Sequence, residues 1–136
     1  MNILIIQGPN LNLIGVKSAK RGKRITLDKI NRAIRRYIRE KDIELKIYQT
    51  HSVEKVITLL QRNRNWADGI IIAPGAWSTY EAVIADTLQL IEVPTVEVYD
   101  EEDTLDYMKT SILTPNCKKT LSAPAEEMFI EALKTL

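Results

Sequence analysis

Two short aliphatic runs, each followed at once by a proline-containing loop, constrain the fold of this sequence most. Residues 3–6 read Ile-Leu-Ile-Ile and lead into Gln7-Gly8-Pro9, while residues 69–72 read Gly-Ile-Ile-Ile and lead into Ala73-Pro74-Gly75. A strand that is apolar on both faces is typical of the centre of a parallel sheet, where helices cover both sides. Open α/β sheets bind their ligands at the carboxyl ends of such strands. We therefore expect a functional site at these two loops.

Helical periodicity alternates with further strand-like runs along the chain. We expect strands at residues 2–7, 43–49, 69–72, 95–99 and 118–121. We expect helices that start near Thr26, Ser52 and Thr79, a short helix after the acidic loop at residues 100–103, and a last helix capped by Ser122. Five βα units of this size predict an α/β fold with a flavodoxin-like, doubly wound, five-stranded parallel sheet of order 2-1-3-4-5. Residues 1–136 are expected to form a single domain.

Composition narrows the possible classes of protein. The 136 residues are 45% apolar and 27% charged, which is typical of a globular chain, and the net charge of +1 supplies no global field toward nucleic acid or a membrane. The single cysteine, Cys117, suits a reducing compartment. We find no signal peptide, no long apolar span and no Cys/His cluster for a metal. The expectation is a cytoplasmic protein without membrane, nucleic-acid or metal partners.

Right-handed crossovers should bring the loops after the first, third and fourth strands to one edge of the sheet. We expect the loops at residues 8–12, 73–80 and 99–102 to enclose one cleft, to which Trp77 and Tyr99 add aromatic surface. The basic run at residues 17–24 is interpreted either as a solvated, mobile lid or as a clamp for a carboxylate or phosphate.

Two further alternatives concern single residues near this edge. Tyr80 and Tyr99 either line the wall or transfer a proton, if a nearby cation lowers the pKa of one of them. Glu97 lies on an otherwise apolar strand, so it needs a partner if it is buried. A structural and a catalytic role for Glu97 both remain open.

The motifs themselves resemble those of type II 3-dehydroquinate dehydratases over nearly the whole chain. Residues 8–15, Gly-Pro-Asn-Leu-Asn-Leu-Ile-Gly, are close to that family's Gly-Pro-Asn-Leu-Asn-Leu-Leu-Gly. Residues 68–76 are similar to its Asp-Gly-Ile-Ile-Ile-Asn-Pro-Gly-Ala, and residues 94–98 to its Pro-Val-Ile-Glu-Val. The resemblance implies a flavodoxin-like fold and the dehydration of 3-dehydroquinate to 3-dehydroshikimate through an enolate, without metal or cofactor. It also implies a homo-oligomer, either a trimer or a dodecamer.

Three of the family's functional residues are present. The resemblance implies that Asn12 helps place the lid tyrosine, that Glu97 orients the general-acid histidine, and that Asp86 reaches toward a neighbouring subunit's site.

Most of the residues that carry the chemistry are replaced. The lid arginine falls on Lys17, the lid tyrosine that acts as the base near Arg21, the enolate-binding asparagine on Ala73, the general-acid histidine on Thr79, the second substrate histidine on Tyr99, and a substrate arginine near Thr104. Alanine donates nothing to an enolate, and threonine cannot protonate a leaving group usefully near neutral pH.

The sequence therefore predicts a homologue with a degenerate active site that binds a small polar or anionic ligand. The candidate catalytic residues are Lys17, Glu97 and Tyr99. The candidate ligand-binding residues are Asn10, Asn12, Arg21, Pro74, Gly75, Ala76, Thr79, Tyr80 and Asp86. The alternatives are a genuine 3-dehydroquinate dehydratase with altered residues and a non-catalytic sensor or assembly subunit. No cofactor is expected.

Overall fold

A computed structural model describes residues 1–103 and 105–136, and within them five strands form one parallel sheet. The strands are β1 (Asn2–Gln7), β2 (Glu44–Gln49), β3 (Gly69–Ala73), β4 (Thr95–Asp100) and β5 (Lys119–Ala123). Their order is β2-β1-β3-β4-β5, and every neighbouring pair is parallel. The predicted flavodoxin-like sheet is confirmed.

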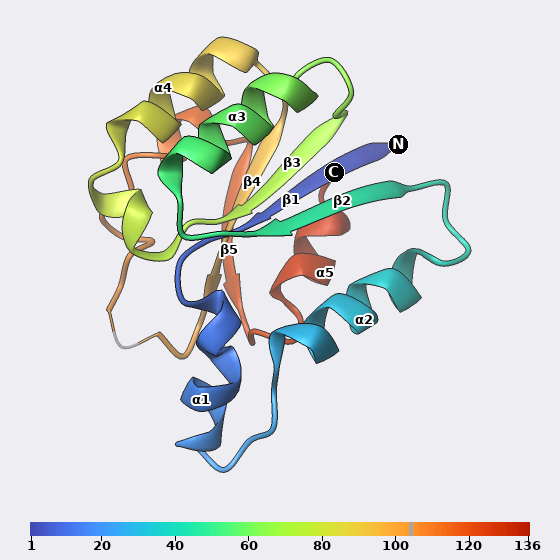
Figure 1. The fold of residues 1–136 in the computed structure, drawn as a ribbon, viewed down its shortest axis with the longest axis vertical. Coiled ribbons are helices and arrows are strands. Elements are labelled where there is room, and N and C mark those ends of the chain that lie inside the picture. Colours follow the sequence, from blue (N-terminus) through green and yellow to red (C-terminus); the bar gives the residue numbers. More distant parts are fainter. Residues whose placement is uncertain (104) are drawn as a thin grey trace.

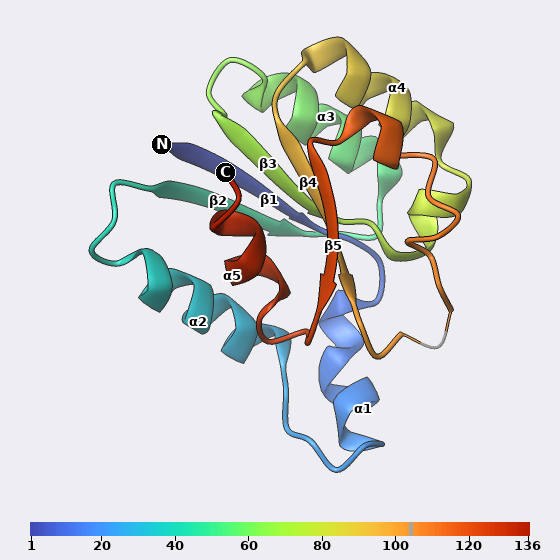
Figure 2. The same cartoon turned by 180° about the vertical axis from the view of Figure 1, so that it is seen from behind.

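Helices cover both faces of this sheet. The α-helices are α1 (Ile14–Ala19), α2 (Leu27–Ile38), α3 (Val53–Asn63), α4 (Ala82–Ile91) and α5 (Met128–Leu133). Short 3-10 helices lie at η1 (Leu11–Leu13), η2 (Gly75–Thr79) and η3 (Thr114–Asn116). Helices α3 and α4 lie on one face and α2 and α5 on the other, while α1 lies beyond the carboxyl ends of the strands (Figures 1 and 2). Within the described ranges, no helix is long and apolar enough to cross a membrane.

Alternation along β1 builds two apolar cores. Ile3 and Ile5 pack on the α2/α5 side with Phe129, whereas Leu4 and Ile6 pack on the α3/α4 side. All four β1 side chains are fully buried, as the apolar run predicts. The predicted starts of α2 and α3 are also confirmed. The Thr26 hydroxyl accepts a hydrogen bond from the Lys29 N–H, and the Ser52 hydroxyl accepts one from the Lys55 N–H, as N-cap residues do.

Two predicted features near the carboxyl terminus are wrong. Ser122 does not cap a helix, because pairing with β4 extends β5 through Ala123 and places Ser122 opposite Tyr99. Helix α5 begins only at Met128, after a turn in which the Glu127 and Met128 N–H groups donate to the Pro124 carbonyl.

The short helix expected after the acidic loop is also absent from residues 105–113, where the chain forms turns. Polar groups of this segment bond to other elements instead. The Ile112 N–H donates to the Ser78 carbonyl at 2.8 Å, and the Ser111 hydroxyl donates to Glu97. Helix α4 likewise starts later than predicted, at Ala82, because residues 75–79 form η2.

Candidate active site

The backbones of the loops that follow β1 and β3 lie in direct contact. The Gly8 N–H donates to the Ala73 carbonyl oxygen at 2.9 Å. A Cβ atom at Gly8 would lie 2.5 Å from that oxygen, so glycine is required there. Asn10 and Gly75, with φ of 70° and 53°, turn the two loops over the sheet edge in the left-handed region.

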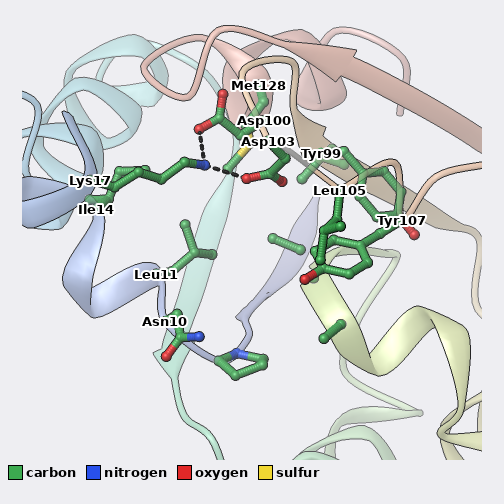
Figure 3. A pocket seen from close by; sticks show the side chains of 15 residues that line it. Asn10, Leu11, Ile14, Lys17, Tyr99, Asp100, Asp103, Leu105, Tyr107 and Met128 are labelled. Atoms are coloured by element: carbon green, nitrogen blue, oxygen red, sulfur yellow. Dashed lines mark hydrogen bonds and ion pairs between the residues drawn. The ribbon is translucent and has the colours of Figure 1, made fainter. Parts of the chain in front are cut away.

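These loops and the one after β4 enclose a single cleft of about 230 Å³, as predicted from the sheet topology. The β1 loop and α1 contribute Pro9, Asn10, Leu11, Ile14 and Lys17. The β3 end and η2 contribute Ala73, Gly75 and Ala76. The remaining lining residues are Val98, Tyr99, Asp100, Asp103, Leu105, Tyr107 and Met128. Figure 3 shows Asn10, Leu11 and Ile14 on one side and Tyr99, Leu105 and Tyr107 on the other.

Three charged side chains meet at one end of the cleft. The Lys17 Nζ lies 2.9 Å from Asp100 Oδ2 and also forms an ion pair with Asp103 (Figure 3). Partial burial lowers the pKa of Lys17, but hydrogen bonds to Asp103 and Asp100 outweigh this effect and raise it. The ammonium group of Lys17 is therefore charged at neutral pH and already occupied by two carboxylates.

Two further cations of the basic run also pair with the acidic loop. Arg21 and Lys23 both contact the Glu102 carboxylate, at 3.2 Å and 2.9 Å. The hydrogen bond from Lys23 lowers the pKa of Glu102, with Arg21 adding to the effect. The basic run thus clamps carboxylates, as one interpretation proposed, but these carboxylates belong to the protein's own chain.

Glu97 lies behind the cleft in a ring of hydroxyl groups. Its side chain is 0% exposed, and Tyr99 and Ser111 donate to Oε2 at 2.7 Å and 2.8 Å. Thr114 and Thr120 donate to Oε1. Among the residues described, no cation pairs with Glu97. These four donors satisfy the buried carboxyl group, which gives it a structural role.

Tyr99 is therefore a buried hydrogen-bond donor. Burial raises the pKa of Tyr99 far above its ordinary value; hydrogen bonds with Ser111 and Ser78 oppose this effect without cancelling it, and the bond to Glu97 adds to the rise. The condition for proton transfer, a cation that lowers this pKa, is not met. Tyr99 stays protonated at neutral pH and forms part of the cleft wall.

The cleft brings together some of the predicted site residues and leaves others outside. Asn10, Lys17, Gly75, Ala76 and Tyr99 line it. Those outside its lining are Asn12, Arg21, Pro74, Thr79, Tyr80, Asp86 and Glu97.

Several of the outlying residues face solvent. Thr79 is exposed and donates its hydroxyl proton to the Ala76 carbonyl, Tyr80 is 62% exposed, and Asp86 is exposed on α4. The position near Thr104, which the resemblance relates to a substrate arginine, lies outside the described residues.

Trp77 does not add aromatic surface to the cleft, and that prediction is wrong. Its side chain is buried in the apolar core between the sheet and helices α3 and α4. Trp77 lies in the 3-10 helix η2, in a stretch that was predicted to be a loop. Tyr107 supplies the aromatic surface in place of Trp77.

Leu105, Tyr107 and Met128 are among the lining residues that the sequence did not suggest. Met128 could have been expected, because β5 is next to β4 and its carboxyl end points to the same edge. No pattern in the sequence marks Leu105 or Tyr107, which lie in a segment of irregular turns.

Fold and cleft together define a flavodoxin-like α/β protein with its site at the carboxyl edge of the sheet. The family model for class II dehydroquinases matches residues 1–136. A 3-dehydroquinate dehydratase from Thermoanaerobacter pseudethanolicus is 33% identical, with 98% of this chain and 92% of the relative covered. One from Dictyoglomus turgidum is 35% identical, with coverages of 100% and 95%. The chain belongs to the type II dehydroquinase family.

The fold agrees with a crystal structure from the same family. The type II dehydroquinase from Butyrivibrio crossotus superposes with a TM-score of 0.89 at 27% sequence identity, covering 99% of this chain and 96% of that one.

Proposed function

We propose that this chain is a type II dehydroquinase homologue with a degenerate active site, which is not an efficient 3-dehydroquinate dehydratase and binds a small polar molecule in its cleft. The proposal is based on the side chains that line the cleft. Within the described residues, the lining contains one ammonium group, two carboxylates and two phenols, but no imidazole or guanidinium group. The dehydration requires a base, an acid for the leaving hydroxyl and a donor for the enolate.

The groups now at the family's catalytic positions support this proposal. Ala73 has no side-chain donor where the resemblance places the enolate-binding asparagine. The Thr79 hydroxyl donates its hydrogen bond to the Ala76 carbonyl. Glu97, which the resemblance makes the partner of a histidine, holds the Tyr99 hydroxyl. Among the described residues of the lining Lys17 is the cation, and its ammonium group is paired with Asp100 and Asp103.

A direct assay tests the proposal. The enone product of 3-dehydroquinate dehydration absorbs in the ultraviolet, so turnover can be followed beside the Thermoanaerobacter pseudethanolicus relative under identical conditions. We expect turnover that is absent or at least about 10⁴-fold lower than the relative's, because acid, base and enolate donor are lost together. Far-ultraviolet circular dichroism confirms that the assayed protein is folded. Turnover near the relative's rate would contradict the proposal.

A second candidate is a genuine 3-dehydroquinate dehydratase, a lyase, that uses altered residues. The identity of 33–35% to proteins of that name favours it. The same assay separates the two candidates. If 3-dehydroquinate is not turned over, two candidates remain: a divergent enzyme, and a non-catalytic sensor or assembly subunit. A divergent enzyme converts the molecule that it binds, whereas a non-catalytic protein releases that molecule unchanged.

A further inference from the structure

The cleft combines a largely apolar body with one charged end. Leu11, Ile14, Val98, Leu105 and Met128 are in its lining, and so are the rings of Tyr99 and Tyr107. In Figure 3 the charged end lies at Lys17, Asp100 and Asp103, and Asn10 lies at the opposite end with Leu11 between. Such a shape suits a molecule with an apolar or aromatic body and one charged group.

The charge balance at that end is negative. One ammonium faces two carboxylates, so the side chains of Lys17, Asp100 and Asp103 sum to −1. Asp100 is held in place, because its side chain is 8% exposed and its Oδ1 accepts the Glu102 N–H at 3.0 Å. Arg21 and Lys23 do not compensate, since both pair with Glu102 outside the lining.

A carboxylate ligand would meet an unfavourable arrangement here. To reach Lys17 it would have to displace Asp103 or Asp100, which places three negative charges around one ammonium. A ligand with an ammonium group would instead be attracted by the two carboxylates. Lys17 is 32% exposed on α1, so its flexible stem can move its charge into solvent and leave both carboxylates to the ligand.

We propose that the cleft binds a small molecule with an aromatic or other apolar body and a protonated primary amine, which replaces the Lys17 ammonium between Asp100 and Asp103. The proposal names the ligand class for the cleft of the proposed function and rests on it. The aromatic rings of Tyr99 and Tyr107 and the apolar side chains from α1 to α5 contact the body of the ligand.

Two probes of matched shape test this inference. Tyramine and 3-(4-hydroxyphenyl)propanoate share a phenol ring and a two-carbon link, and they differ in carrying an amine or a carboxylate. We expect tyramine to bind the wild-type protein at least about tenfold more tightly in calorimetry at low salt, because charge-assisted hydrogen bonds to both aspartates are available only to the amine. Tighter binding of the propanoate, or no measurable binding of tyramine, would overturn the proposal.

Variants of the triad make opposite predictions for the two ligand classes. Lys17→Met removes the competing ammonium, so tyramine should bind more tightly, whereas a site for carboxylates would lose its only lining cation among the described residues. Asp103→Asn should weaken tyramine binding at least about tenfold. Glu131→Gln is the control, since Glu131 is outside the lining in an exposed ion pair with Lys134, and it should leave tyramine affinity within about twofold.

The outcomes for the amine site and for the proposed function are separable. Weakening of tyramine binding by Lys17→Met would overturn the amine site, whatever the dehydratase assay gives. Efficient turnover of 3-dehydroquinate would overturn the proposed function, whatever tyramine does. Circular dichroism spectra identify misfolded variants, which are then excluded. The comparison of tyramine with the propanoate uses the wild-type protein alone, so it does not depend on the folding of any variant.

Discussion

Four hydroxyl groups surround the carboxyl group of Glu97, and this arrangement decides what that residue can do. Tyr99 comes from the same strand, whereas Ser111 and Thr114 come from the segment that returns to β5, and Thr120 comes from β5 itself. All donate, so the carboxyl oxygens have little capacity left for a ligand. Glu97, which the family resemblance relates to the orientation of a histidine, thus anchors β4 to the chain that follows it.

Substitution of Glu97 measures the strength of this anchor. We expect Glu97→Ala to lower the free energy of unfolding by about 3 kcal/mol or more, because four hydroxyl donors lose their acceptor in a dry interior. Glu97→Gln should cost less, about 1–2 kcal/mol, because its amide oxygen still accepts two of these bonds. Urea denaturation checks both values. Equal stability of all three proteins would mean that water replaces the carboxylate at no cost.

Cys117 offers a second test at the scale of a residue. Burial raises the pKa of its thiol to about 12, and the charge of Glu97 adds to the effect. Fewer thiolates form at neutral pH, so we expect the native thiol to react with a disulfide reagent at least about 100-fold more slowly than the unfolded chain. Raising the pH through 9 should keep accelerating the native reaction, whereas the unfolded thiol, with an ordinary pKa of 9.0, should level off. A native rate that levels off near pH 9 would contradict the raised pKa.

At the scale of elements, the contact between α1 and the loop after β4 closes one end of the cleft. Lys17 reaches Asp100 and Asp103, and the turn after α1 reaches Glu102 through Arg21 and Lys23. The outer pairs are exposed, so each contributes little to global stability and weakens in salt. Their effect is local, because they hold the segment between α1 and α2 against the acidic loop.

Limited proteolysis tests this local effect. Trypsin cleaves after lysine and arginine, and residues 20–24 contain four such sites. We expect Glu102→Gln to accelerate cleavage there several-fold, because Arg21 and Lys23 lose their ion pairs with the carboxylate and the segment opens more often. Glu131→Gln is the matched control, since it removes an exposed ion pair with Lys134 on α5. The contact would be irrelevant to this segment if both variants were cut at the wild-type rate.

At the scale of the whole molecule, one surface has the character of an interface. Val83, Asp86 and Leu90 recur on one side of α4, and Leu90 is 73% exposed. Asp86 is the residue that the family resemblance relates to a neighbouring subunit's site. We propose that α4 takes part in a closed homo-oligomer, a trimer or a dodecamer, in which these apolar side chains are covered.

Light scattering coupled to size-exclusion chromatography checks this assembly. We expect the wild-type protein to elute as a trimer or dodecamer at micromolar concentration. Leu90→Lys should shift it toward the monomer, because a charge would be buried without a partner. Leu13→Lys, which changes an exposed apolar residue on η1, serves as the comparison and should leave the mass unchanged. A monomeric wild-type protein would contradict the proposal.

Local patterns in the sequence determined the scaffold. The apolar runs of β1 and β3 predicted a parallel sheet, and Thr26 and Ser52 marked the starts of two helices. These features depend on residues within a few positions of one another, so they can be read directly from the chain. The order of the strands followed from topology rules, and with it the edge at which the cleft lies.

Only the tertiary structure decided the chemistry at that edge. Lys17 and Asp100 are 83 positions apart, and their ion pair depends on how α1 and the β4 loop pack. The four hydroxyl groups on Glu97 and the inward orientation of Trp77 likewise depend on contacts between separate segments. Hydrogen bonds and ion pairs act over a few ångströms, so residues distant in sequence acquire a function only when the fold fixes their side chains in one place.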